Sequence, residues 1–98
     1  MAKLERHYQT EILHKIRQRL PECMILKNDS GYIQGIPDWT IFYKDRWGML
    51  EIKRSASSSI QPNQEFWVRE MNNLSFAAFI FPENEEEVLD ALQRALQS

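Results

Sequence analysis

The sequence predicts an α/β domain in which a mixed sheet is flanked by helices, and three observations lead to that prediction. Its 98 residues suffice for one hydrophobic core and correspond to a single domain. Apolar residues make up 43% of the chain and aromatic residues 11%, which is typical of a globular protein. Segments with helical and with strand-like apolar spacing follow one another in the order α-β-β-β-α-β-α.

The first two elements are a helix over residues 4–20 and a short strand over residues 23–27. Apolar side chains recur at every fourth position of the helix, as expected for one buried stripe: Leu4, Tyr8, Ile12, Ile16 and Leu20. Pro21 ends this helix. The run CMILK is short, apolar and β-prone, and NDSG after it is a turn sequence.

Two further strands are expected at residues 39–43 (WTIFY) and 49–53 (MLEIK). The sequence KDRWG between them contains a glycine, which predicts a hairpin with a five-residue loop. Trp47 would then lie in the turn, where an exposed aromatic suits either a DNA contact or a contact with a second subunit. The sequence does not choose between these two roles.

A polar connection over residues 54–60 leads to a helix that starts near Pro62 and ends at residue 74, with Phe66 and Trp67 expected in the core. The apolar run at 76–81 predicts a central, buried strand. After Pro82 comes a final helix, with Asn84 as N-cap and Glu87 completing a capping box. The β-α-β segment 49–81 predicts a parallel crossover, and hence a mixed sheet.

Charge and cysteine content exclude several classes of protein. The net charge of -2 argues against a purely electrostatic nucleic-acid binder, although residues 1–60 carry ten Lys/Arg against seven Asp/Glu. That excess fits either a local basic face or scattered solvated charges. The single Cys23 permits no internal disulfide and is expected in the core. No signal-peptide core or membrane span is found, so a soluble cytoplasmic protein is expected.

The stretch GIPDWTIFYKDRWGMLEIKRS places charged residues in two predicted strands, where burial is costly. In MLEIK the two-residue period puts Glu51 and Lys53 on one face of the strand, opposite the apolar face. A hairpin centred on residues 44–45 would set Asp38 opposite Glu51, whereas a longer turn would offset the two. The sequence leaves this register open.

A pair of carboxylates with a lysine is the side-chain set that metal-dependent phosphodiester hydrolysis requires. Asp38 and Glu51 would repel each other unless a hard cation such as Mg²⁺ or Mn²⁺ lay between them. Lys53 could then orient an attacking water or stabilise charge on a phosphate. Gln64, on the first turn of the second helix, could reach the same cleft. The simpler alternative is that Asp38 caps a turn while Glu51 and Lys53 form an ordinary ion pair.

The combined motif GIPDWTIF…GMLEIKRS…QPNQEFW resembles the VRR-NUC (virus-type replication-repair nuclease) branch of the PD-(D/E)XK phosphodiesterases. This resemblance covers about residues 4–80, including the order of Glu5, Gln9 and the paired aliphatics of the first helix. It implies metal ligation by Asp38, Glu51 and the backbone carbonyl of Ile52. It also implies catalysis by Lys53, with Glu5 acting through metal-bound water and Gln64 in support; Glu11 is a competing candidate for the helix acid.

By this resemblance the protein would be an Mg²⁺-dependent DNA endonuclease, with Mn²⁺ able to substitute and no small-molecule cofactor. The expected substrate is branched DNA such as a Holliday junction or a flap, and the expected assembly is a homodimer of phage or prophage origin. Basic residues that flank the predicted cleft are candidate DNA contacts: Lys27, Lys44, Arg46 and Arg54. The alternative is a non-catalytic nucleic-acid-binding or assembly module. His7 and His14 are expected to be solvated helix residues.

Overall fold

The computed structural model describes residues 4–98 and contains a four-stranded mixed sheet with three helices. The predicted α/β class and the element order are confirmed: α1 (Glu5–Arg19), β1 (Met24–Lys27), β2 (Trp39–Tyr43), β3 (Arg46–Ile52), α2 (Pro62–Leu74), β4 (Phe76–Ile80), the single 3-10 turn η1 (Pro82–Asn84) and α3 (Glu85–Gln97). None of the helices described is long and apolar enough to cross a membrane.

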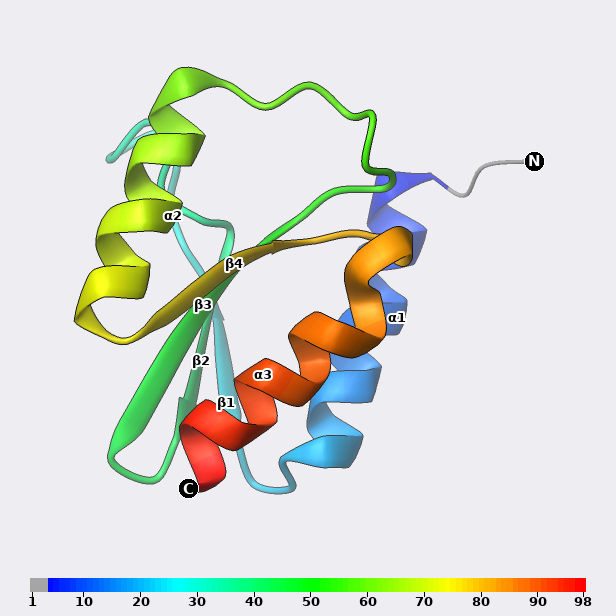
Figure 1. Cartoon of the computed structure of the whole chain (residues 1–98), viewed down its shortest axis with the longest axis vertical. Coiled ribbons are helices and arrows are strands. Elements are labelled where there is room, and N and C mark those ends of the chain that lie inside the picture. Colours follow the sequence, from blue (N-terminus) through cyan, green and yellow to red (C-terminus); the bar gives the residue numbers. More distant parts are fainter. Residues whose placement is uncertain (1–3) are drawn as a thin grey trace.

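The sheet has the order β1-β2-β3-β4, with antiparallel pairing throughout except between β3 and β4. The predicted parallel crossover is therefore present, and α2 forms its helix. Helices α1 and α3 lie on one face of the sheet and α2 lies on the other (Figure 1). A long connection from the end of β3 leads to the start of α2.

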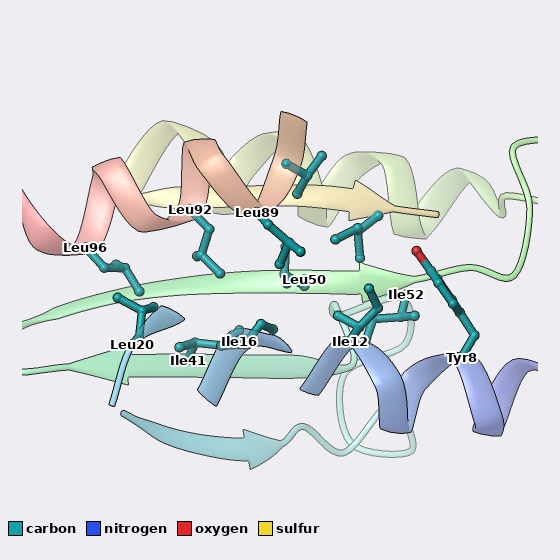
Figure 2. Packing of buried hydrophobic residues seen from close by; sticks show 12 residues of the cluster. Tyr8, Ile12, Ile16, Leu20, Ile41, Leu50, Ile52, Leu89, Leu92 and Leu96 are labelled. Atoms are coloured by element: carbon teal, nitrogen blue, oxygen red, sulfur yellow. The ribbon is translucent and has the colours of Figure 1, made fainter. Parts of the chain in front are cut away.

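The core fills the space between the sheet and the α1–α3 layer (Figure 2). The expected stripe of α1 is confirmed, since Tyr8, Ile12 and Ile16 are buried, while Leu4 is exposed. Completely buried side chains from the strands meet this stripe and Leu89 and Leu92 of α3: Ile41, Leu50, Ile52 and Ile80. Cys23 is half-buried at the edge of this core, and His7 and His14 are exposed as predicted.

The hairpin between β2 and β3 differs from the predicted five-residue loop. Tyr43 pairs with Arg46, so only Lys44 and Asp45 form the turn, and Lys44 adopts a left-handed backbone with φ of 56°. Gly48 lies within β3, where a Cβ would come within 3.0 Å of Leu92 Cδ1. The glycine therefore serves the close packing of α3 on the sheet, and not the turn.

The apolar strand β4 is an edge strand, so the prediction of a central strand was wrong. Its neighbour on one side is β3, and no strand of the described chain lies beyond it. It is nevertheless apolar on both faces because α2 packs against one face and α3 against the other. Coverage by helices on both sides, and not a central position, explains its composition.

The start of α3 also differs from prediction. The Asn84 side chain does not cap the helix; its Oδ1 accepts from the Phe81 backbone N–H at 2.9 Å, and its Nδ2 donates to the Phe79 carbonyl. Of the first-turn glutamates, Glu85 accepts hydrogen bonds from Tyr8 (3.0 Å) and from Lys15. These bonds join α1 to α3 and give Glu85 a structural role.

Helix α2 covers only part of its face of the sheet. It packs on β3 and β4, and none of its side chains is fully buried: Trp67 is half-buried and Phe66 is 43% exposed, contrary to the prediction that both lie in the core. Exposed apolar side chains of β1 and β2, together with the last residue of α2, form a surface that we call the open sheet face: Met24, Leu26, Phe42 and Leu74. Trp47 lies in β3, half-buried next to this face, and not in the turn.

Candidate active site

The register of the hairpin brings the two predicted carboxylates to the same position. Trp39 pairs with Leu50. Continued by one residue, this register sets Asp38, directly before β2, opposite Glu51, with which it interacts. Leu50 and Ile52 are fully buried in the core, and Glu51 points to the opposite face, towards α2. The alternative in which the hairpin is centred on residues 44–45 is thus the one that the chain adopts.

Glu51 is a buried acid in an unusual state. It is only 3% exposed, and its Oε1 atom is buried with no hydrogen-bond partner. Burial, followed by the negative charge of Asp38, raises the pKa of Glu51 from 4.5 to about 8, while Lys53 acts in the opposite direction. Carboxyl groups that are costly to ionise in the absence of a cation are common in functional sites.

Lys53 and Gln64 complete the group around Glu51. Lys53 Nζ lies 3.9 Å from Glu51 Oε2 and donates a hydrogen bond to Gln64 Oε1 at 3.1 Å. Gln64 Nε2 donates in turn to Glu51 Oε2 at 3.4 Å. The same Gln64 oxygen accepts from the backbone N–H of Gln61 at 3.0 Å, which fixes its orientation at the start of α2. The side chain of Gln64 therefore bridges the acid and the lysine.

Asp38 is partly open to solvent, with 22% of its side chain exposed. Lys27 Nζ lies 3.7 Å from Asp38 Oδ1 and 4.8 Å from the centre of the Trp39 ring. Lys27, a predicted DNA contact, thus also forms an ion pair with Asp38 that was not predicted. The ion pair follows from the register of β1 on β2, which pairs Lys27 with Trp39, next to Asp38. It could not be predicted because the sequence does not fix that register.

The segment before Asp38 is held against the start of α2. Gly35 has a φ of 90°, and a Cβ there would lie 2.5 Å from Asn63 Cβ and 2.7 Å from the Asn63 carbonyl carbon. Only glycine combines this backbone conformation with such a close approach. Because Gln64 follows Asn63, this contact sets Asp38 and Gln64 relative to each other.

We expect Gly35→Ala to destabilise the protein by about 2–4 kcal/mol, because it adds both backbone strain and a steric clash. Urea unfolding followed by circular dichroism measures the change. Gly31→Ala is the matched control, since its Cβ would meet only a side chain, Asp29, with Oδ1 at 3.0 Å, and Gly31 does not have the positive φ of Gly35. An equal effect of the two substitutions would contradict the role assigned to Gly35.

Other predicted site residues lie apart from this group. Glu5 is exposed on the first turn of α1, and Glu11 lies near Tyr8 and Lys15, on the side of α1 that faces α3. Within residues 4–98 no group of three or more His, Cys, Asp or Glu side chains is placed to hold a metal ion. Neither glutamate therefore joins the Asp38–Glu51 pair as a direct ligand, and indirect action through water stays a prediction for Glu5.

The basic candidates are distributed over both ends of the sheet. Lys27 lies at Asp38, and the exposed Arg54 directly follows Lys53. Lys44 and Arg46 lie at the hairpin turn, the end of β2 and β3 remote from Asp38. Arg46 there donates hydrogen bonds to the Ala95 carbonyl and to Ser98 Oγ. The prediction that Lys44 and Arg46 flank the carboxylate pair was therefore wrong.

The residues present fit a hard divalent cation. Asp38 and Glu51 supply two neighbouring carboxylates, and the buried, unpartnered Oε1 of Glu51 is an acceptor with no donor to satisfy it. Carboxylate oxygens are the donors that Mg²⁺ and Mn²⁺ prefer. Ile52 is buried at the end of β3, and ligation by its carbonyl stays a prediction.

Comparison with known proteins identifies no relative: no family model, no curated protein and no solved structure matches the chain.

Proposed function

We propose that this protein is a divalent-metal-dependent DNA endonuclease with the PD-(D/E)XK fold and a VRR-NUC-like site. The observation that carries the proposal is the buried Glu51 carboxylate, held beside Asp38 with an unpartnered oxygen and bridged by Gln64 to Lys53. The element order and the mixed sheet support the fold assignment. An ion pair with only a structural role would not require an acid whose ionised form is so disfavoured.

In this proposal Asp38, Glu51 and the Ile52 carbonyl hold Mg²⁺, for which Mn²⁺ can substitute. When bound, such an ion supplies Lewis-acid stabilisation of phosphate charge and a more acidic water. Lys53 keeps its ammonium group at the site through the hydrogen bond to Gln64, leaving further N–H donors for an anionic phosphate oxygen. The reaction adds water across one P–O bond, so one product ends in a phosphate and the other in a hydroxyl.

The proposed substrate is branched DNA, such as a Holliday junction or a flap, cut inside a bacterial cell during phage or prophage DNA metabolism. Lys27 and Arg54, near the carboxylates, would contact the DNA backbone close to the cut. Lys44 and Arg46 lie about five residue pairs away along the hairpin, at roughly 3.3 Å per residue. They could therefore contact only a more distant part of the DNA, such as another arm of a junction.

Cleavage of labelled junction, flap, duplex and single-stranded DNA tests the proposal. With Mg²⁺ or Mn²⁺ we expect cutting of branched DNA, none in EDTA, and a fall of at least about 10²-fold in Asp38→Asn, which removes one ligand charge. Asp45→Asn, at the remote hairpin turn, is the matched control and should cut like wild type. Cutting that persists in EDTA would contradict the mechanism. DNA binding without any cutting, equal in wild type and Asp38→Asn, would support the binding-module alternative.

We also propose that two copies associate, because two symmetric active sites suit the paired incisions of a symmetric junction. A dimer of standard size buries about 800 Å² per subunit, which is roughly an eighth of the 6182 Å² surface of the chain. The open sheet face would supply the apolar part of that interface. Its side chains are exposed in the single chain, with Met24 at 61% and Leu74 at 74%.

Light scattering after gel filtration tests the dimer. We expect a dimer for wild type and a monomer for Leu74→Arg, since an arginine in an apolar interface would be buried without a partner. Leu4→Arg, at an exposed leucine outside the open sheet face, should remain dimeric. A monomeric wild type at all concentrations would remove the proposal of paired active sites.

A further inference from the structure

Asn28, directly after β1, makes three hydrogen bonds around Asp38. Its backbone N–H donates to the Asp38 carbonyl at 2.7 Å, and its Nδ2 donates to the Pro37 carbonyl at 2.8 Å. Its Oδ1 accepts from the Thr40 hydroxyl at 3.0 Å. These three partners are Asp38 itself, the residue before it (Pro37) and a residue shortly after it in β2 (Thr40).

We propose that Asn28 is a positioning residue that holds Asp38 in the orientation needed to bind a divalent metal ion. This inference rests on the proposed function and adds to it a residue outside the predicted site. The Asp38 side chain lies beside the Glu51 carboxyl group and pairs at 3.7 Å with Lys27, whose side chain is 55% exposed. The position of the Asp38 carboxylate relative to these two side chains depends on how the backbone of Asp38 is held.

Two supports hold that backbone from opposite sides. On the α2 side, Gly35 packs directly on Asn63. On the β1 side, Asn28 holds the carbonyls of Pro37 and Asp38. Without the Asn28 side chain, the segment between Gly35 and β2 would lose the hydrogen bond to its Pro37 carbonyl. Asp38 could then shift relative to Glu51.

The side chain of asparagine is chemically specific here. One short side chain must donate to the Pro37 carbonyl and also accept from Thr40, which is 5% exposed and would otherwise bury an unpaired hydroxyl. Aspartate has the same shape but cannot donate when ionised, so Asn28→Asp would set two acceptors against each other. It would also add a negative charge near Asp38, which on electrostatic grounds alone would attract a cation.

In Asn28→Asp the loss of positioning should weaken metal binding, whereas the added negative charge should strengthen it, so the variant distinguishes the two effects. A positioning role predicts about 10–100-fold weaker Mn²⁺ binding despite the added negative charge, as for other residues that orient metal ligands. Thr40→Val, which removes only the donor to Asn28, should weaken Mn²⁺ binding about 3–10-fold. Asn73→Asp adds the same charge at an exposed site on α2 and should change Mn²⁺ affinity less than about 2-fold.

Calorimetric titration with Mn²⁺ measures affinity, and amide hydrogen exchange of the metal-free protein gives an independent measure of Asp38 positioning. The backbone N–H of residue 28 is hydrogen-bonded to the Asp38 carbonyl. We expect its exchange rate to be at least 10-fold faster in Asn28→Asp and unchanged in Asn73→Asp. Circular dichroism confirms that each variant is folded at the titration temperature.

The outcomes separate the inference from the proposed function. If wild type binds Mn²⁺ and folded Asn28→Asp binds it equally or more tightly, the positioning role is overturned and the nuclease proposal stays intact. Should Asn28→Asp not fold, unchanged Mn²⁺ affinity and unchanged Asn28 exchange in Thr40→Val overturn it in the same way. An absence of any Mn²⁺ binding by wild type overturns both.

Discussion

Replacing Lys53 with methionine is expected to lower the rate of DNA cleavage by about 10²–10⁴-fold while leaving the protein folded. Methionine keeps the apolar stem of a side chain that is only 13% exposed, and removes the charge and the donors. The Gln64 oxygen keeps its bond from the Gln61 backbone, so the start of α2 should be preserved. Single-turnover cleavage at saturating protein measures the effect on the chemical step, apart from DNA affinity.

Arg94→Met is the matched control for Lys53→Met. It also replaces one positive charge by methionine, on an exposed position of α3 on the opposite face of the sheet. Its cleavage rate should stay within about 2-fold of wild type, because exposed charges beyond a Debye length are screened. Lys53→Met that cut DNA at the wild-type rate would show that Lys53 has no part in the chemistry, even if metal binding were confirmed.

Much of the fold could be predicted because local patterns and packing agree. The alternation of Leu50 and Ile52 with charged neighbours identified the core face of β3 and placed Glu51 on the other face, and the stripe of α1 identified its core face. Positions that depend on packing between distant segments were harder. Gly48 suggested a turn, but its lack of a side chain accommodates Leu92 of α3, while Lys44 takes the left-handed conformation of the turn.

Edge and central strands could not be distinguished for the same reason. The composition of β4 reflects that α2 and α3 cover both of its faces, and it carries no information on whether a further strand pairs with its second edge. Likewise, the spacing of α2 predicted a buried face that included Phe66, but the helix covers only β3 and β4, so Phe66 stays partly exposed. Apolar patterns indicate which side chains could be buried, and the neighbours decide which of them are.

In the candidate site, too, residues brought together by local pairing could be predicted, whereas those that depend on packing between distant segments could not. Asp38, Glu51, Lys53 and Gln64 could be named because hairpin pairing and a helix start bring them together once one register is chosen. Glu5 could not be placed, since helical phase fixes the direction of a side chain around α1 but not its distance from the sheet. Asn28 was seen only as part of a turn sequence, because its partners lie across β1 and β2.

The stability of the metal-free protein is expected to fall as pH rises from about 5 to 9, because Glu51 binds its proton more tightly in the folded state. Its pKa is about 8 when folded and near 4.5 when exposed, so the folded state holds more protons between these values. The contribution of protonated Glu51 is complete below pH 4.5 and is lost as pH rises through 8. At ~1.4 kcal/mol per pKa unit, the loss is roughly 3–5 kcal/mol, a large part of the stability of a small domain.

Urea unfolding at a series of pH values, in EDTA, measures this loss. Glu51→Gln replaces the protonated acid by a neutral amide of the same shape, so the fall in stability that Glu51 causes between pH 5 and 9 should be absent. Glu65→Gln, at an exposed glutamate of α2, is the control and should keep the wild-type dependence. The difference between wild type and Glu51→Gln isolates Glu51 from the other titrating groups.

Adding Mg²⁺ or Mn²⁺ should reverse the pH dependence of wild type, because a metal ion favours the ionised form of Glu51. Metal affinity should then rise up to about tenfold per pH unit towards pH 8, since binding releases the Glu51 proton. The stabilisation by metal should be largest near pH 9 and absent in Glu51→Gln. Wild-type stability that fell with pH but did not recover with metal would leave Glu51 a buried acid without a cation to bind, and would argue against the proposed nuclease.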